Sequence, residues 1–184
     1  MKKIIFAVVG MAGSGKTEVV KYLEKKGFKR VYFGELTLEE IKKRGLKINE
    51  KNEKKIREEL RRKYGMAAYA LLNLKKIEEK FAKDKVVIDG LYSWDEYKVL
   101  KNRFKNNLVI IAVVTPRLIR YQRLAKRPLR KLSFKEAEAR DYDEIEKLAK
   151  GGPIAIADFY LINDKDFSYL YQQIDKICKN LLNK

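Results

Sequence analysis

The sequence predicts a three-layer α/β fold, with a parallel five-stranded sheet covered by helices on both faces. Apolar, β-branched runs alternate with segments of helical periodicity along the chain. The expected strands are residues 4–9, 31–33, 86–88, 108–114 and 159–162. The expected helices are about 16–26, 36–44, 50–82, 93–104, 116–126, 133–149 and 166–182. This alternation favours parallel strands, whose carboxyl ends usually form the ligand-binding edge.

The chain of 184 residues is predicted to form one domain over residues 1–184, because it contains no internal repeat and no Pro-rich or Gly/Ser-rich linker. Residues 36–82, approximately, place a long helical stretch between the second and third strands, where we expect a helical acceptor-binding insertion. Residues 120–150, approximately, are basic and then acidic and contain Pro128, which disfavours one continuous helix. We expect this segment to be a helical lid.

The charge balance is strongly basic, with 43 Lys and Arg against 25 Asp and Glu and a formal net charge of +18. Such a field attracts nucleotides, RNA or DNA without choosing among them. The alternative is a set of lysines on solvated helix faces that bind nothing. A small-molecule partner is favoured over nucleic acid, because the sequence contains no aromatic-rich RNA-binding motif.

Histidine is absent, and Cys178 is the only cysteine, so histidine-dependent catalysis and an internal disulfide are excluded. The apolar run Ile4–Val9 is too short to span a bilayer and ends at a glycine-rich turn. We therefore expect a cytoplasmic protein without a membrane partner. The sequence does not indicate its oligomeric state.

The strongest motif is GMAGSGKT, which matches the pattern G-x-x-x-x-G-K-[ST] between an expected strand and an expected helix. Glycines let successive backbone N–H groups turn toward a phosphate, and the positive end of the helix adds to the attraction. The predicted nucleotide-binding residues of this segment are Gly10, Ala12, Gly13, Ser14, Gly15, Lys16, Thr17 and Glu18. The alternative is an ordinary glycine turn with an exposed lysine.

Two residues of this motif have predicted roles in the chemistry of ATP. Lys16 is expected to reach the β- and γ-phosphates as a catalytic cation, and the hydroxyl of Thr17 is expected to ligate Mg²⁺. Asp89 ends an apolar run before Gly90 and is the expected second metal-site residue, because Mg²⁺ prefers oxygen ligands. Glu35 follows the second strand and is a candidate at the acceptor. The alternative for Asp89 is that it only caps a turn, and the alternative for Glu35 is helix capping or plain exposure.

Arginines cluster in the expected lid, where positive charge can stabilise a transferring phosphoryl group. Arg120, Arg123 and Arg127 fall at i, i+3 and i+7, so one helix face can present all three to ATP. Arg123 and Arg127 are the predicted catalytic pair. The alternative is a solvated basic helix that contacts RNA.

The insertion carries Arg57 and Arg61 four positions apart, which predicts a site for the acceptor's phosphate. Salt bridges to Glu58 or Glu53 are an equal alternative. Tyr92 is a candidate for stacking against the acceptor, with core packing as its alternative.

Seven short motifs together resemble the nucleoside-monophosphate-kinase-like group of P-loop proteins, especially dephospho-CoA kinase and an archaeal family of related, uncharacterised nucleotide kinases. They are GMAGSGKT, VYFGE, LRRKYG, VVIDG, RLIRYQRLAKR, EARDYDE and ADFYLIND. The resemblance covers nearly the whole chain. It implies an adenine site near Arg123 and Asp158 and an acceptor under residues 35–65. One departure is Leu91-Tyr92, where related archaeal sequences carry an arginine.

These observations predict an ATP-dependent, Mg²⁺-dependent phosphotransferase that acts on a nucleotide-like acceptor, such as a nucleoside monophosphate or dephospho-CoA. One alternative is a P-loop ATPase switch associated with RNA or ribonucleoprotein. A weaker alternative is a regulatory module that binds nucleotide without turnover.

Overall fold

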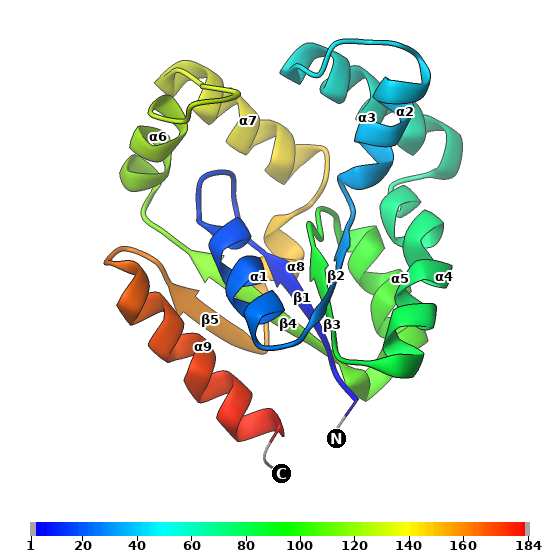
Figure 1. Ribbon diagram of the computed structural model, residues 1–184. Coiled ribbons are helices and arrows are strands. Elements are labelled where there is room, and N and C mark those ends of the chain that lie inside the picture. The colour runs from blue at the N-terminus through cyan, green and yellow to red at the C-terminus, as the bar shows by residue number, and fades with distance from the viewer. Residues whose placement is uncertain (1–2, 183–184) are drawn as a thin grey trace.

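A computed structural model describes residues 3–182, and Figure 1 shows the resulting arrangement of a central sheet between helices. All strand pairings are parallel, in the order β2-β3-β1-β4-β5. The strands are β1 (Ile5–Val9), β2 (Lys29–Tyr32), β3 (Val86–Asp89), β4 (Leu108–Val114) and β5 (Phe159–Ile162). The predicted parallel five-stranded sheet with flanking helices is therefore confirmed.

Helices cover both faces of this sheet, because strands β1 and β4 at its centre are apolar at every position. Ile5, Ala7 and Val9 of β1 pack in one buried cluster with residues of α4 and α5. Phe6 and Val8 pack on the other face with residues of α1 and α9. The helices are α1 (Lys16–Lys25), α2 (Glu35–Lys43), α3 (Glu50–Tyr64), α4 (Ala68–Lys83), α5 (Trp94–Phe104), α6 (Arg117–Ala125), α7 (Phe134–Glu146), α8 (Gly151–Ala155) and α9 (Phe167–Leu182), with a short 3₁₀ turn η1 (Lys105–Asn107).

Two of the expected long helices are wrong in their extent. The predicted helix 50–82 is broken between α3 and α4, because Gly65 adopts φ 79°, a left-handed conformation that ends a helix. The predicted helix 133–149 ends at Glu146, and Ala149 at φ 48° turns the chain into the separate helix α8. The apolar periodicity continues across both breaks, so periodicity alone does not predict where these helices end.

Two helical regions rise above the carboxyl edge of the sheet, as Figure 1 shows: α2 and α3 on one side, α6 and α7 on the other. Ion pairs connect α3 with the segment that contains α7. Arg130 Nη2 lies 2.7 Å from Glu53 Oε1, and Lys54 Nζ lies 3.1 Å from Asp143 Oδ2. The carboxyl edge is thus enclosed from both sides. Within residues 3–182, no helix is long and apolar enough to cross a bilayer.

Candidate active site

The P-loop lies between β1 and α1 and contains three glycines with positive φ, of which Gly13 and Gly15 lie closest to the left-handed helical region. Gly13 has φ 80° and Gly15 has φ 97°, a region that side chains rarely adopt. A Cβ at Gly13 would approach the carbonyl oxygen of Arg120 to 2.8 Å, and a Cβ at Gly15 would collide with the side-chain amide of Asn163. Both positions therefore require glycine for space as well as for conformation.

Residues far along the chain hold this loop in place. The carbonyl oxygen of Ser14 accepts hydrogen bonds from Asn163 Nδ2 at 2.7 Å and from Thr115 Oγ1 at 3.0 Å. Both donors are buried. Asn163 belongs to the motif ADFYLIND, which does not by itself predict a contact with the phosphate loop, and Thr115 lies outside all seven motifs.

Lys16 begins α1 and points back along the loop. Its Nζ donates to the carbonyl oxygens of Gly10 at 2.8 Å and Met11 at 3.0 Å. Burial, followed by the nearby ammonium of Lys150, lowers the pKa of Lys16 to about 7. The protonated amine is therefore electrostatically unfavourable in this cavity unless an anion accompanies it.

The P-loop forms the floor of a cavity of about 1030 Å³, which we call the P-loop cavity. Eight basic and four acidic side chains line it. The basic residues are Lys16, Arg30, Arg123, Arg127, Arg130, Arg140, Lys150 and Lys165, and the acidic residues are Glu18, Asp89, Glu144 and Asp166. This excess of positive charge suits a polyanionic ligand.

Thr17, in the first turn of α1, and Asp89, at the carboxyl end of β3, both line this cavity. Asp89 Oδ2 accepts two hydrogen bonds from Arg30, from Nε at 3.1 Å and Nη2 at 2.5 Å, which orients the carboxylate. A hydroxyl and a carboxylate are hard oxygen donors of the kind that Mg²⁺ prefers, so the pair fits that ion. The described residues contain no group of three or more His, Cys, Asp or Glu that could hold a metal without other ligands.

The lid arginines do not share one role. Arg123 and Arg127 line the P-loop cavity, and burial, followed by repulsion from Arg140, lowers the pKa of Arg127. Arg120 is different, because it is buried and donates to Asp141 and to the carbonyl oxygen of Ala12. The expectation that Arg120 would close over ATP with the other two is therefore wrong. Helix α6 ends at Ala125, so the i+7 position is no longer on the same helical face.

A buried ionic group from α7 and the start of α8 completes the wall of the P-loop cavity. Glu144 Oε2 lies 2.8 Å from Lys150 Nζ, and Glu144 Oε1 lies 3.3 Å from Arg140 Nε. Burial alone would raise the pKa of Glu144, but Lys150, Arg140 and Lys16 outweigh it and lower that pKa to about 2. Arg140 and Glu144 belong to the motif EARDYDE, whereas Lys150 lies outside all seven motifs.

A second cavity of about 580 Å³ lies between α3, α4 and α7. We call it the acceptor cavity, after the predicted acceptor-binding residues that line it. It shares five lining residues with the P-loop cavity: Tyr32, Tyr92, Arg130, Arg140 and Glu144. The two cavities therefore adjoin, and two arginines stand at their junction.

Arg57, Arg61 and Tyr92 all line the acceptor cavity. Arg57 lies 2.7 Å from Glu50 and 3.5 Å from Glu53. The guanidinium of Arg61 lies 5.1 Å from the ring centroid of Tyr69, and its buried Nε has no hydrogen-bond partner among the described residues. Burial raises the pKa of Tyr92, so its hydroxyl stays protonated at neutral pH.

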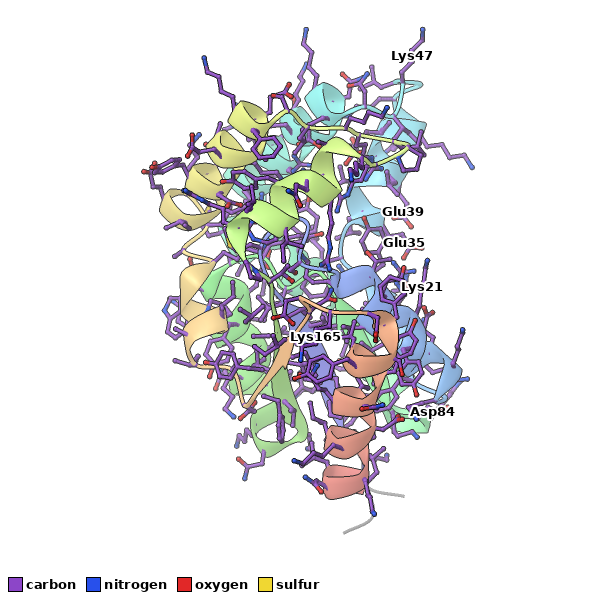
Figure 2. The ribbon with its side chains drawn as sticks, turned by 90° about the vertical axis from the view of Figure 1, so that its left-hand side faces the viewer. Lys21, Glu35, Glu39, Lys47, Asp84 and Lys165 are labelled. Carbon is purple, nitrogen blue, oxygen red and sulfur yellow. The ribbon has the colours of Figure 1, made fainter. Side chains whose placement is uncertain are left out.

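Four of the predicted site residues line neither cavity. Gly10 and Ser14 lie within the phosphate loop itself, whereas Glu35 and Asp158 lie elsewhere. Glu35 pairs with Lys76, and Figure 2 shows it beside Glu39 on the outer side of α2. Asp158 precedes β5, and its Oδ2 accepts a hydrogen bond from the backbone N–H of Ile110 at 2.7 Å. That contact lies at the amino edge of the sheet, opposite the P-loop, so Asp158 does not border the cavity that Asn163 lines.

Residues 7–148 match a protein family described as AAA domain. The chain is 36% identical over 183 residues to a UPF0200 protein of Thermococcus onnurineus, covering 97% of this chain and 98% of the relative. It is 34% identical over 183 residues to a UPF0200 protein of Sulfurisphaera tokodaii, covering 97% of both chains.

Solved structures of two kinases share the fold. A shikimate kinase from Bacteroides thetaiotaomicron superposes with a TM-score of 0.61 at 17% identity, over 98% of this chain and 99% of that chain. A gluconokinase from Sinorhizobium meliloti superposes with a TM-score of 0.57 at 14% identity, over 98% and 97%. The chain thus has a P-loop kinase-like fold, and it belongs to the UPF0200 proteins, with an AAA domain over residues 7–148.

Proposed function

We propose that this protein is an ATP-dependent phosphotransferase that moves the γ-phosphoryl group of Mg-ATP to a nucleotide-like acceptor. The observation that carries the proposal is the pair of adjoining cavities, one on the P-loop and one between α3, α4 and α7. A transferase must hold two substrates with their reacting atoms close together. A switch ATPase needs only the first cavity.

The donor half of the reaction uses the P-loop cavity. The backbone N–H groups from Gly13 to Thr17 bind the phosphates, and Lys16 turns from its own loop carbonyls to the β- and γ-phosphates. Thr17 and Asp89 would hold Mg²⁺, which would neutralise phosphate charge. Arg123 and Arg127 approach the phosphates from above and stabilise negative charge on them.

The acceptor half uses Arg57 and Arg61 for an anionic group and Tyr92 for a contact with the acceptor's ring or hydroxyls. An acceptor oxygen forms a bond to the γ-phosphorus while the bond from that phosphorus to the β,γ-bridging oxygen breaks. The bridging oxygen keeps the electron pair and leaves on ADP. A phosphate oxygen attacks without proton transfer, whereas a hydroxyl acceptor passes its proton to solvent.

The likeness to shikimate kinase and gluconokinase supports a small-molecule acceptor but does not select one. Nucleoside monophosphates and dephospho-CoA remain the leading candidates, because the acceptor cavity combines arginines with tyrosine rings. The cavity of about 580 Å³ is in the size range of small-molecule sites.

A screen of ADP release with Mg-ATP against nucleoside monophosphates, their deoxy forms and dephospho-CoA tests the proposal. Lys16→Ala serves as the blank. Lys16-dependent ADP release with a stoichiometric phosphorylated product supports the kinase and names its acceptor. Silence with every acceptor, together with ATP hydrolysis stimulated by RNA, would overturn it in favour of the RNA-associated ATPase.

A further inference from the structure

Lys150 is a buried amine in the wall of the P-loop cavity, and the nucleotide-binding motif does not include it. Its exposed fraction is 1%, and its Nζ lies 2.8 Å from Glu144 Oε2 and 5.1 Å from the ring centroid of Tyr92. Lysine is almost never fully buried unless it is paired, because desolvating an ammonium is costly. A residue of this kind beside a cavity calls for a functional explanation.

The backbone around Lys150 is built to hold the side chain there. The N–H of Lys150 donates to the carbonyl oxygen of Glu144 at 3.1 Å, so both ends of the ion pair belong to one tight turn. Ala149 adopts φ 48°, a conformation uncommon for a residue with a side chain. Directly after the turn, a Cβ at Gly152 would approach the Trp94 ring to 2.6 Å, so α8 packs closely against α5.

Lys150 and Lys16 reach the same cavity from elements on opposite faces of the sheet. Lys16 opens α1, which packs on one face, whereas Lys150 precedes α8, which packs with α5 on the other. Their ammonium groups repel each other across the cavity, and Lys150 is the charged group that most strongly lowers the pKa of Lys16. Glu144 acts electrostatically on all three of Lys150, Arg140 and Lys16. Each of these cations has one further carboxylate nearby: Glu96 for Lys150, Glu50 for Arg140 and Asp89 for Lys16.

The partners of Lys150 also mark the route to the acceptor. Glu144, Arg140 and Tyr92 line both cavities, whereas Lys150 itself lines only the P-loop cavity. The amine is therefore next to the junction, on the donor side. An anionic group that passes from one cavity to the other must come close to it.

We propose that Lys150 is a second phosphate-binding lysine, which contacts the transferring phosphoryl group from the side opposite Lys16, and that Glu144 is its positioning residue. This rests on the proposed function. Lys150 neither gives nor takes a proton in the transfer. Its ammonium binds the equatorial phosphoryl oxygens. Before a phosphate binds, Glu144 stabilises the charged form of the Lys150 amine and fixes its position.

The test compares Lys150→Met, Lys150→Arg and a control that removes the same charge elsewhere, Lys101→Met on the exposed side of α5. Steady-state kinetics with Mg-ATP and the identified acceptor are measured alongside the rise in melting temperature caused by tripolyphosphate. We expect Lys150→Met to lower kcat about 100-fold with little change in either KM. Lys150→Arg should recover part of kcat, and Lys101→Met should match the wild type.

Because Lys150→Met removes one of the two ion-pair partners of the buried Glu144, the double variant Glu144→Gln/Lys150→Met keeps the test informative if the single variant misfolds. Its folding is checked by circular dichroism. If either folded variant keeps a kcat within twofold of the wild type and an unchanged tripolyphosphate shift, the proposed role of Lys150 is overturned. The proposed kinase activity still stands in that case, provided that Lys16→Ala abolishes turnover. If the wild type turns over no acceptor, the proposed function fails separately. In that case, a tripolyphosphate shift that is lost in Lys150→Met supports the phosphate site, and an unchanged shift overturns it.

Discussion

Arg120 of α6 donates two parallel hydrogen bonds to Asp141 of α7, at 2.9 Å to Oδ1 and 2.6 Å to Oδ2, and a third at 3.0 Å to the carbonyl oxygen of Ala12. Tyr121 Oη donates to the same carboxylate at 3.1 Å. One buried guanidinium therefore connects the phosphate loop with both helices of the α6–α7 segment. Neither charge can be solvated if its partner is removed.

Removal of one partner of this pair should destabilise the protein by about 3–5 kcal/mol, because it leaves an uncompensated buried charge. We expect this loss for Arg120→Met and for Asp141→Leu in urea unfolding. The double variant should recover part of it, because neither charge remains. A loss below about 1 kcal/mol in both single variants would contradict the assignment of Arg120 as a structural residue.

The central sheet and the phosphate loop could be predicted from the sequence because their signals are local. Strand β1 is an uninterrupted apolar run, and the spacing of Gly10, Gly15 and Lys16 specifies the loop. The role of Arg120 could not be predicted in this way. Arg120 and Arg123 lie on one helix, as their spacing predicts, but spacing alone does not show which face of that helix is buried.

The missed residues depend on contacts between distant parts of the chain. Asn163 reaches Ser14 across 149 positions, and Lys150 gains its surroundings only when α8 folds against α5. Asp158 was predicted to bind the nucleotide, but it lies at the amino end of β5, whereas Asn163 follows the carboxyl end of the same strand. A resemblance in short motifs cannot distinguish the two ends of a strand.

Glu96→Gln should stabilise the protein above pH 7. Glu96 accepts hydrogen bonds from the backbone N–H groups of Tyr92 and Ser93, and burial raises its pKa to about 7. A raised carboxyl pKa means that the folded state favours the protonated form, so wild-type stability falls as pH rises from about 4.5 to 7.

Glutamine keeps an acceptor for both N–H groups without a charge to bury. We expect a gain of roughly 1–3 kcal/mol at pH 8 and a smaller difference at pH 5, measured by urea unfolding at both values. The control is Glu79→Gln, a glutamate in the middle of α4. If the gain in unfolding free energy of Glu96→Gln over the wild type is smaller at pH 8 than at pH 5, the pKa of Glu96 is not raised in the folded state.

Polyphosphate binding should take up protons at alkaline pH. The pKa of Lys16 is lowered to about 7 in the open cavity, so most of its amine is neutral at pH 8.5. A bound phosphate favours the ammonium form and raises that pKa. Calorimetric titration with tripolyphosphate in two buffers of different ionisation enthalpy should therefore report net proton uptake at pH 8.5 and little at pH 6.

Lys150→Met serves as the internal comparison, because removal of the neighbouring ammonium raises the pKa of Lys16 and should reduce the uptake. Heats that are independent of the buffer at pH 8.5 would mean that Lys16 is already charged in the open cavity.

Arg61→Met should weaken binding of the acceptor without affecting ATP. The Arg61 guanidinium lines the acceptor cavity but not the P-loop cavity, and its buried Nε is free to donate. A charge-assisted hydrogen bond to an anionic acceptor is worth about 1.5–3 kcal/mol, which corresponds to a rise of at least about tenfold in the acceptor's KM. The KM for Mg-ATP should stay within about twofold, because its cavity is unchanged.

Lys63→Met removes a charge from the same last turn of α3 and lies outside both cavities, so it provides the matched control. Equal effects of the two substitutions on the acceptor's KM would show that general electrostatic attraction, rather than a specific contact of Arg61, draws the acceptor to this cavity.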